Sequence, residues 1–118
     1  MNLLRGDVWY VDLDPTRGGE INKQRPCVIF SSNSVNRRRN TVVVPLSSSP
    51  TVRPPVTIAV NLNGRPGVAV TDQIAAKAKE RFGNRVGSLT VDEMKAIEAG
   101  LRQVLGMSEI RGQRVFGQ

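Results

Sequence analysis

One amphipathic helix pattern, placed near the C-terminus after a series of short strand-like runs, most constrains the fold of this chain. Thr90 and Glu93 form a capping box that begins the helix, and Gly106 provides its C-terminal cap. Between them, an apolar stripe at helical spacing predicts a face that packs on a sheet. We interpret the stripe as core rather than as a binding site; it comprises Val91, Met94, Ile97, Leu101, Val104 and Leu105.

The rest of the chain is patterned as short strands separated by Gly, Pro and polar turns. β-branched and apolar runs predict strands over residues 8–13, 26–31, 41–46, 56–62, 67–71 and 84–89, with loops over 14–24, 32–40 and 48–55. Asn63-Gly64 predicts a tight hairpin turn. Residues 74–82 favour a helix by propensity, although they carry no apolar stripe. The prediction is a mainly β (α+β) fold, a small curled antiparallel sheet or half-open barrel with one helix.

The length of 118 residues, of which 39% are hydrophobic, suits a single domain over 1–118, with a polar and basic tail over about 107–118. No run approaches the roughly 20 apolar residues that span a bilayer. A strand pattern follows the N-terminus at once and leaves no room for a signal peptide. We therefore expect a cytoplasmic protein that does not enter a membrane.

The net charge of +7 is concentrated in residues 1–89, which hold 13 Lys and Arg against 6 Asp and Glu. A field of that sign attracts a polyanion or an acidic protein, although it also serves solubility alone. The chain has no His, and Cys27 stands alone in an apolar run. The usual general base, the usual triads and most zinc sites are thereby excluded, and we expect neither a metal nor a cofactor. Cys27 is interpreted as a small buried hydrophobe.

Two of the predicted strands place a cation opposite a cluster of hydroxyls. If Ser31 pairs with Thr41, the numbers of opposed residues sum to 72, and Arg25 falls opposite Ser47; a slip of one residue is the alternative. Pro26 restricts Arg25 to extended geometry. Pro45, in the other strand, predicts an edge that is open to a ligand.

Such a site suits the cleavage of RNA, which carries its own nucleophile in the 2′-OH. Arg25 would stabilise charge on the phosphate, Ser47 would donate to a phosphate oxygen, and Glu20 in the glycine-rich loop is a candidate base. DNA lacks that hydroxyl and would not be cut in this way. The alternative is that Arg25 is a surface ion-pair partner and 47–49 an ordinary turn.

Several motifs resemble the MazF/PemK family of toxin ribonucleases, with similar spacing over residues 5–106. They are Arg5-Gly6-Asp7-Val8-Trp9, Asp12-Leu13-Asp14-Pro15-Thr16, Gly18, Glu20, Arg25-Pro26, Val44-Pro45-Leu46-Ser47-Ser48, Gly67-Val68-Ala69-Val70, Asp72-Gln73 and the late helix after Gly87. The resemblance implies an SH3-like barrel with a C-terminal helix, and a homodimer. It also implies sequence-selective, metal-independent cleavage of single-stranded RNA to a 2′,3′-cyclic phosphate and a 5′-OH, which inhibits growth. An acidic MazE-like antitoxin would neutralise the toxin.

By this resemblance Arg25 matches the catalytic arginine, Ser47 the catalytic Thr or Ser, and Glu20 a loop acid. The adjacent Ser48 is the alternative to Ser47, and the base stays open. Asp72 and Gln73 match residues that contact RNA bases. Further candidates for RNA contact are Thr16, Arg17, Ser48, Arg37 and Arg38.

The chain departs from the family pattern at three places. Gly19-Glu20-Ile21 stands where Ser-Glu-Gln is usual, which puts one base contact in doubt, and Ser replaces the commoner Thr at 47. The triplet at 37–39 lies outside the pattern and is either a solvated loop or a phosphate clamp. Two other classes of function compete: a CcdB-like gyrase poison, although the expected C-terminal Trp is missing, and a nucleic-acid-binding module without turnover.

Overall fold

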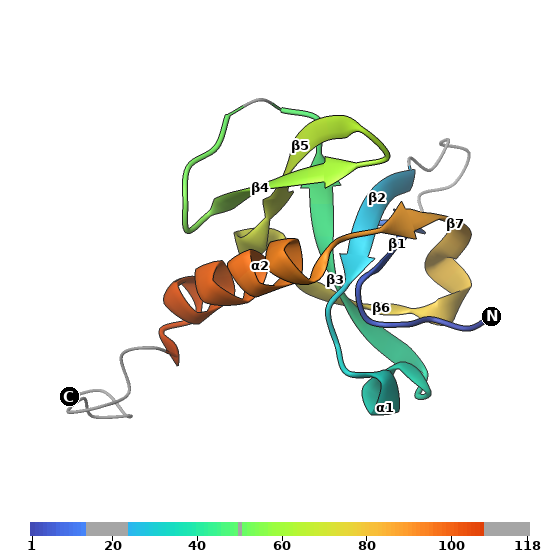
Figure 1. Cartoon of the computed structure of the whole chain (residues 1–118). Coiled ribbons are helices and arrows are strands. Elements are labelled where there is room, and N and C mark those ends of the chain that lie inside the picture. The colour runs from blue at the N-terminus through green and yellow to red at the C-terminus, as the bar shows by residue number, and fades with distance from the viewer. Residues whose placement is uncertain (14–23, 50, 108–118) are drawn as a thin grey trace.

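A computed structural model describes residues 1–13, 24–49 and 51–107 and shows a curled antiparallel sheet beside a C-terminal helix (Figure 1). The sheet runs in the order β4-β5-β3-β2-β1-β7, and β6 also pairs with β3. The predicted half-open barrel with one helix is therefore confirmed. The strands are β1 Asp7–Asp12, β2 Gln24–Ile29, β3 Asn40–Ser47, β4 Thr57–Leu62, β5 Arg65–Val70, β6 Ala75–Ala78 and β7 Phe82–Ser88.

Strand β3 is the centre of the sheet and not an edge, so the expectation drawn from Pro45 is wrong. β2 pairs along one side of β3, while β6 pairs with Asn40 to Val43 and β5 with Leu46 and Ser47 along the other. Pro45 falls in the gap between these two partners. A proline is tolerated there because its missing N–H interrupts no ladder on that side.

The helix α2, Val91–Val104, begins as predicted. The Thr90 side chain accepts a hydrogen bond from the Glu93 backbone, and the Glu93 side chain returns one to the backbone of Thr90. Gly106 follows the helix with φ +72°, the left-handed conformation that suits glycine. The stripe is buried only in its middle: Val91 is 69% and Leu105 53% exposed, so the expectation of core fails at both ends.

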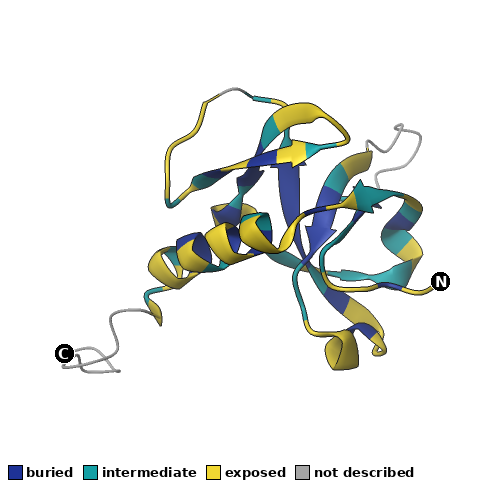
Figure 2. Cartoon of the chain, viewed as in Figure 1, coloured by how far each residue is buried: buried dark blue, intermediate teal, exposed yellow. Residues whose placement is uncertain are grey.

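Successive side chains of β1, β2 and β3 point to opposite faces of the sheet, as in any strand. The larger core cluster includes Val8, Val28 and Val44 and packs against Ile97 of α2. The smaller cluster, on the opposite face, comprises Leu3, Val11, Cys27, Ile29, Val43 and Phe82. Figure 2 shows the buried stretches gathered along these central strands and along one side of α2.

Two local predictions are wrong. Residues 74–82 form β6 and the 3₁₀ turn η2, Lys79–Arg81, instead of a helix, because pairing with β3 outweighs the helix propensity of this Ala-rich segment. Residues 32–40 contain one helical turn, α1 Asn33–Asn36, which Ser32 caps.

The hairpin turn at Asn63-Gly64 is confirmed. Both residues have positive φ, 53° and 83°, as a two-residue turn between twisted strands requires. Within the described ranges, no helix has both the length and the apolar character that crossing a bilayer demands.

Candidate functional site

The register of β2 on β3 brings Arg25 and Ser47 to the same end of the sheet. Cys27 pairs with Pro45, Val28 with Val44 and Ile29 with Val43, so each pair sums to the predicted 72. The described ladder ends at Cys27 and Pro45, and the same count continued by two residues would set Arg25 opposite Ser47. Because opposed residues share a face, both belong to the face of the smaller cluster.

Arg25 is an exposed cation in β2, directly opposite Val11 of β1. None of the carboxylates in the described ranges forms an ion pair with it, whereas Arg81 pairs with Asp12 and Arg85 with Asp7. Among the described residues no side-chain hydrogen bond or ion pair of this guanidinium is found, so its fork of donors, which fits phosphate oxygens, can bind an external anion.

Ser47, the last residue of β3, is half-buried. Its Oγ accepts a hydrogen bond from the backbone N of Ser49 at 3.2 Å, which leaves the hydroxyl proton available to a ligand. Strand β5 approaches this residue closely because Gly67 has no side chain: a Cβ at 67 would lie 2.5 Å from the carbonyl oxygen of Ser47. Gly67 thus permits the close β3–β5 pairing beside Ser47.

A groove of about 500 Å³ opens beside Ser47 and Ser48. It lies between the tip of the β4–β5 hairpin and the strands β1, β2 and β7. Pro26, the neighbour of Arg25, lines it together with Tyr10, Asn63 and Arg65. An aromatic ring, an amide and a cation beside two hydroxyls form a surface on which a base can stack and a phosphate can be bound. Tyr10, Asn63 and Arg65 were not among the predicted site residues. The pairing of Tyr10 with Pro26 across β1 and β2 is the signal that could have identified Tyr10.

Cys27 is fully buried, as predicted, and lies beneath Arg25 on the same face. Burial raises the pKa of the thiol to about 12, although the charges of Arg25 and Lys77 oppose the rise. The thiol is therefore protonated at neutral pH and is a poor nucleophile.

The other candidate residues are not all brought to this end of the sheet. Asp72 and Gln73 are exposed in the 3₁₀ turn η1, Thr71–Gln73, which lies between β5 and β6 and contacts α2. Arg37 and Arg38 are exposed at the start of β3, and the eight residues of that strand separate them from Ser47 by about 23 Å. Thr16, Arg17 and Glu20 lie outside the described residues.

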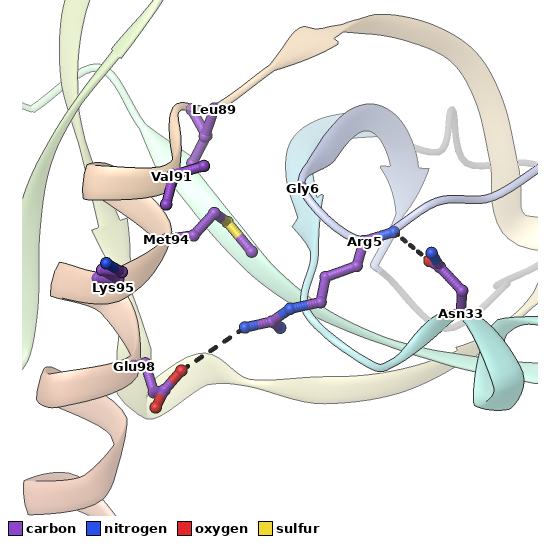
Figure 3. A pocket seen from close by; sticks show the side chains of 8 residues that line it. All are labelled: Arg5, Gly6, Asn33, Leu89, Val91, Met94, Lys95 and Glu98. Carbon is purple, nitrogen blue, oxygen red and sulfur yellow. Dashed lines mark hydrogen bonds and ion pairs between the residues drawn. The ribbon is translucent and has the colours of Figure 1, made fainter.

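A second pocket, of about 470 Å³, lies between the N-terminal segment and α2 (Figure 3). One of its two cations is engaged: Arg5 pairs with Glu98 at 3.7 Å, and its guanidinium lies 4.3 Å from the centre of the Phe30 ring. The other, Lys95, also lines the pocket. The backbone N of Arg5 donates to Asn33 at 2.8 Å. These contacts hold the N-terminal segment against α2, so we assign this pocket a structural role.

Comparison with known families gives one match over most of the chain. The family described as "PemK-like, MazF-like toxin of type II toxin-antitoxin system" matches residues 4–105. Among curated proteins, endoribonuclease MazF9 of Mycobacterium tuberculosis is 31% identical over 111 residues, covering 85% of this chain and 93% of the relative. The endoribonuclease toxin MazF of Escherichia coli K12 is 28% identical, covering 86% and 92%.

Solved structures agree with this match. A mycobacterial endoribonuclease in complex with its cognate antitoxin is 28% identical, with a TM-score of 0.73 over 88% of this chain and 95% of that one. A MazE-MazF structure from Deinococcus radiodurans has a TM-score of 0.77 over 91% and 98%, at 19% identity, and supports the fold alone.

Proposed function

This chain belongs to the PemK-like, MazF-like toxin family of type II toxin–antitoxin systems, and we propose that it is a metal-independent endoribonuclease that cuts single-stranded RNA. The substrate would be mRNA in the cytoplasm, whose cleavage at short sequences stops translation and growth. The whole chain, 1–118, would act as a single domain, with the segment after residue 106 as a tail.

The proposed reaction uses the nucleophile of the substrate. The 2′-oxygen of a ribose attacks the adjacent phosphorus, a new P–O2′ bond forms, and the P–O5′ bond breaks. The products are a 2′,3′-cyclic phosphate and a 5′-OH. One proton leaves the 2′-OH and one reaches the departing 5′-oxygen, so the protein must assist two proton transfers and stabilise the charge on the phosphorane.

The observation that carries the proposal is Arg25 itself: an exposed guanidinium, unpaired among the described carboxylates, at the end of the sheet where Ser47 also lies. A preorganised donor aimed at developing phosphate charge is typically worth about 10²–10³ in rate. Ser47 would donate its hydroxyl proton to a phosphate oxygen, with Ser48 as the alternative. Glu20 is the proposed general base.

RNA would extend from this point over the groove. The groove residues Tyr10 and Arg65 can supply stacking and a phosphate contact, and Asp72 and Gln73 are proposed to read bases. Thr16 and Arg17 are proposed contacts from the loop. Arg37 and Arg38 would form a distal phosphate clamp, because they are exposed at the far end of β3.

Two protein partners belong to the proposal. The first is an acidic MazE-like antitoxin, as in the mycobacterial complex; adding a purified cognate antitoxin should abolish cleavage. The second is another copy of this chain. Leu105 and Met107 are more than half exposed beside a cavity that Phe30 and Ile74 also line, which favours an apolar interface. Sedimentation of Leu105→Glu should then show monomers, and wild-type protein that sediments as a monomer would refute the dimer.

The test is cleavage of a long single-stranded RNA and of DNA with the matching sequence, in the presence of EDTA. We expect only the RNA to be cut, with cyclic phosphate and 5′-OH ends identified by mass spectrometry. Arg25→Ala should lower the rate by at least about 10²-fold. The control Lys95→Ala alters an exposed cation on α2 and should leave the rate unchanged.

Undiminished cleavage by Arg25→Ala would overturn the assignment of the site. Inhibition of gyrase without cleavage of any RNA would instead favour the CcdB-like poison, and binding of RNA without turnover would favour the nucleic-acid-binding module.

A further inference from the structure

Lys77, in β6, is a half-buried cation that has no part in the reaction described above. Strand β6 pairs with β3 in a register that sets Lys77 opposite Thr41 and Ala75 opposite Val43. Val43 belongs to the smaller core cluster together with Cys27. Because opposed residues share a face, Lys77 lies on the same face of the sheet as Arg25.

The side chain of Lys77 extends to the end of β1. Its Nζ donates to the carbonyl oxygen of Leu13 at 3.4 Å. Leu13 follows Asp12, which is paired with Gln24, the neighbour of Arg25. The long side chain therefore delivers a positive charge to the end of the sheet where Arg25 lies, while its stem covers the apolar cluster.

Lys77 and Arg81 both reach the end of β1, but they differ in the partners that they meet there. Arg81 also reaches the end of β1, where it donates to the Asp12 carbonyl at 3.3 Å, but it lies 3.8 Å from the Asp12 carboxylate as well. Lys77 meets a neutral carbonyl and, in the part of the chain that the structure describes, no carboxylate within ion-pair distance. An ammonium has three N–H donors, and one of them is used within the described residues.

The buried thiol of Cys27 is influenced by both cations. Arg25 and Lys77 both act to lower the pKa of this thiol, against the larger effect of its burial. Since charge effects weaken with distance, both cations lie close to the same sulfur. Two cations on one face, neither of which pairs with a carboxylate in the described ranges, suit two successive phosphates of a nucleic acid strand better than they suit one carboxylate.

We propose that Lys77 binds the RNA phosphate next to the one held by Arg25, and so aligns the strand at the point of cleavage. The proposal rests on the proposed ribonuclease function and adds a second phosphate site to it. Its competitor is a purely structural lysine that caps the Leu13 carbonyl.

The experiment uses an RNA that the wild-type protein cuts, resynthesised with a 2′-deoxy nucleotide at the attacking position so that it binds without reacting. Dissociation constants are measured by fluorescence anisotropy over a range of KCl concentrations for Lys77→Gln and for the control Lys95→Gln, an exposed lysine on α2. Glutamine retains a donor for the Leu13 carbonyl, so a loss of affinity reports the charge.

For Lys77→Gln we expect an affinity about three- to tenfold lower and a salt slope, log K against log[KCl], that is smaller by about 0.7, the value for one phosphate contact on a single strand. Lys95→Gln should match the wild type. A neutral methylphosphonate placed next to the cleaved bond should weaken binding by the wild type and not further weaken binding by Lys77→Gln, because the same contact is already lost.

Equal affinity, equal salt slope and equal methylphosphonate effects in Lys77→Gln and wild type would overturn the proposal and leave Lys77 as a structural residue. If Lys77→Gln fails to fold, the wild-type protein provides the test: bound RNA should protect Lys77 but not Lys95 from acetylation, and an unprotected Lys77 refutes the site. A wild-type protein that cuts no RNA would refute the ribonuclease function instead, which separates the two failures.

Discussion

The two faces of β1, β2 and β3 are made from alternating residues of the same strands, yet they differ in what covers them. On one face, Val8, Val28 and Val44 meet α2 through Ile97, and the larger core is closed by a helix. On the other, Val11, Cys27 and Val43 form a smaller core. The cations Arg25 and Lys77 also belong to this second face.

The difference indicates that one short sheet supports both the stability of the fold and the proposed cleavage chemistry. Apolar burial is non-directional and strong, so the helix-covered face can stabilise the fold with apolar side chains alone. Unneutralised cations are tolerated where they reach solvent at a rim, as Arg25 does. Stability and cleavage should therefore respond to different substitutions, and three predictions test this.

The largest expected effect is on the helix-covered face. Ile97→Ala removes a fully buried side chain and should lower the free energy of unfolding by about 2–5 kcal/mol, measured by urea denaturation. Its cleavage rate per folded molecule should stay at the wild-type level. Arg25→Ala should do the reverse, with stability within about 0.5 kcal/mol of wild type. Equal losses of stability in both variants would refute the separation of stability from cleavage.

A smaller effect separates the two adjacent hydroxyls at the end of β3. Ser47→Ala should reduce the cleavage rate constant by about 10-fold to 10²-fold, since one donor to the phosphate is lost. Ser48→Ala, its matched control, should change the rate less than about threefold, because Ser48 lies beyond the last β3–β5 pair. Single-turnover rates would measure both, and the opposite ranking would move the catalytic hydroxyl to Ser48.

The smallest effect concerns the far end of β3. Asn36, which is 3% exposed, anchors the loop before this strand by donating to the Ser31 carbonyl at 3.0 Å, and it thereby holds Arg37 and Arg38 beside β3. The double variant Arg37→Gln, Arg38→Gln should bind long RNA about threefold more weakly and reduce the salt slope by about 1.4. Binding of a short oligonucleotide should not change. An equal loss on short and long RNA would mean that these arginines act at the cleavage point.

Local patterns were sufficient for much of this architecture. The β2–β3 register followed from matching two apolar runs, because a slip of one residue would have turned Val28 and Val44 away from the larger core. The capping box at Thr90 and Glu93 and the turn at Asn63-Gly64 depend only on residues a few positions apart. The placement of Arg25 and Ser47 toward the same end of β2 and β3 was predictable for the same reason, while their direct opposition stays a prediction.

Only the assembled sheet decided the rest. Residues 75–78 have helical propensity, but β3 offers them a free side for pairing, and that long-range pairing turns Lys77 onto the face of Arg25. Pro45 has the pattern of an edge residue and yet lies in the central strand, because β5 and β6 leave a gap beside it. How much of the apolar stripe of α2 is buried likewise depended on the tertiary structure. Its two ends, Val91 and Leu105, stay exposed. Short-range signals specify turns, caps and alternation, whereas a residue's neighbours across the sheet depend on contacts between distant segments that no local pattern encodes.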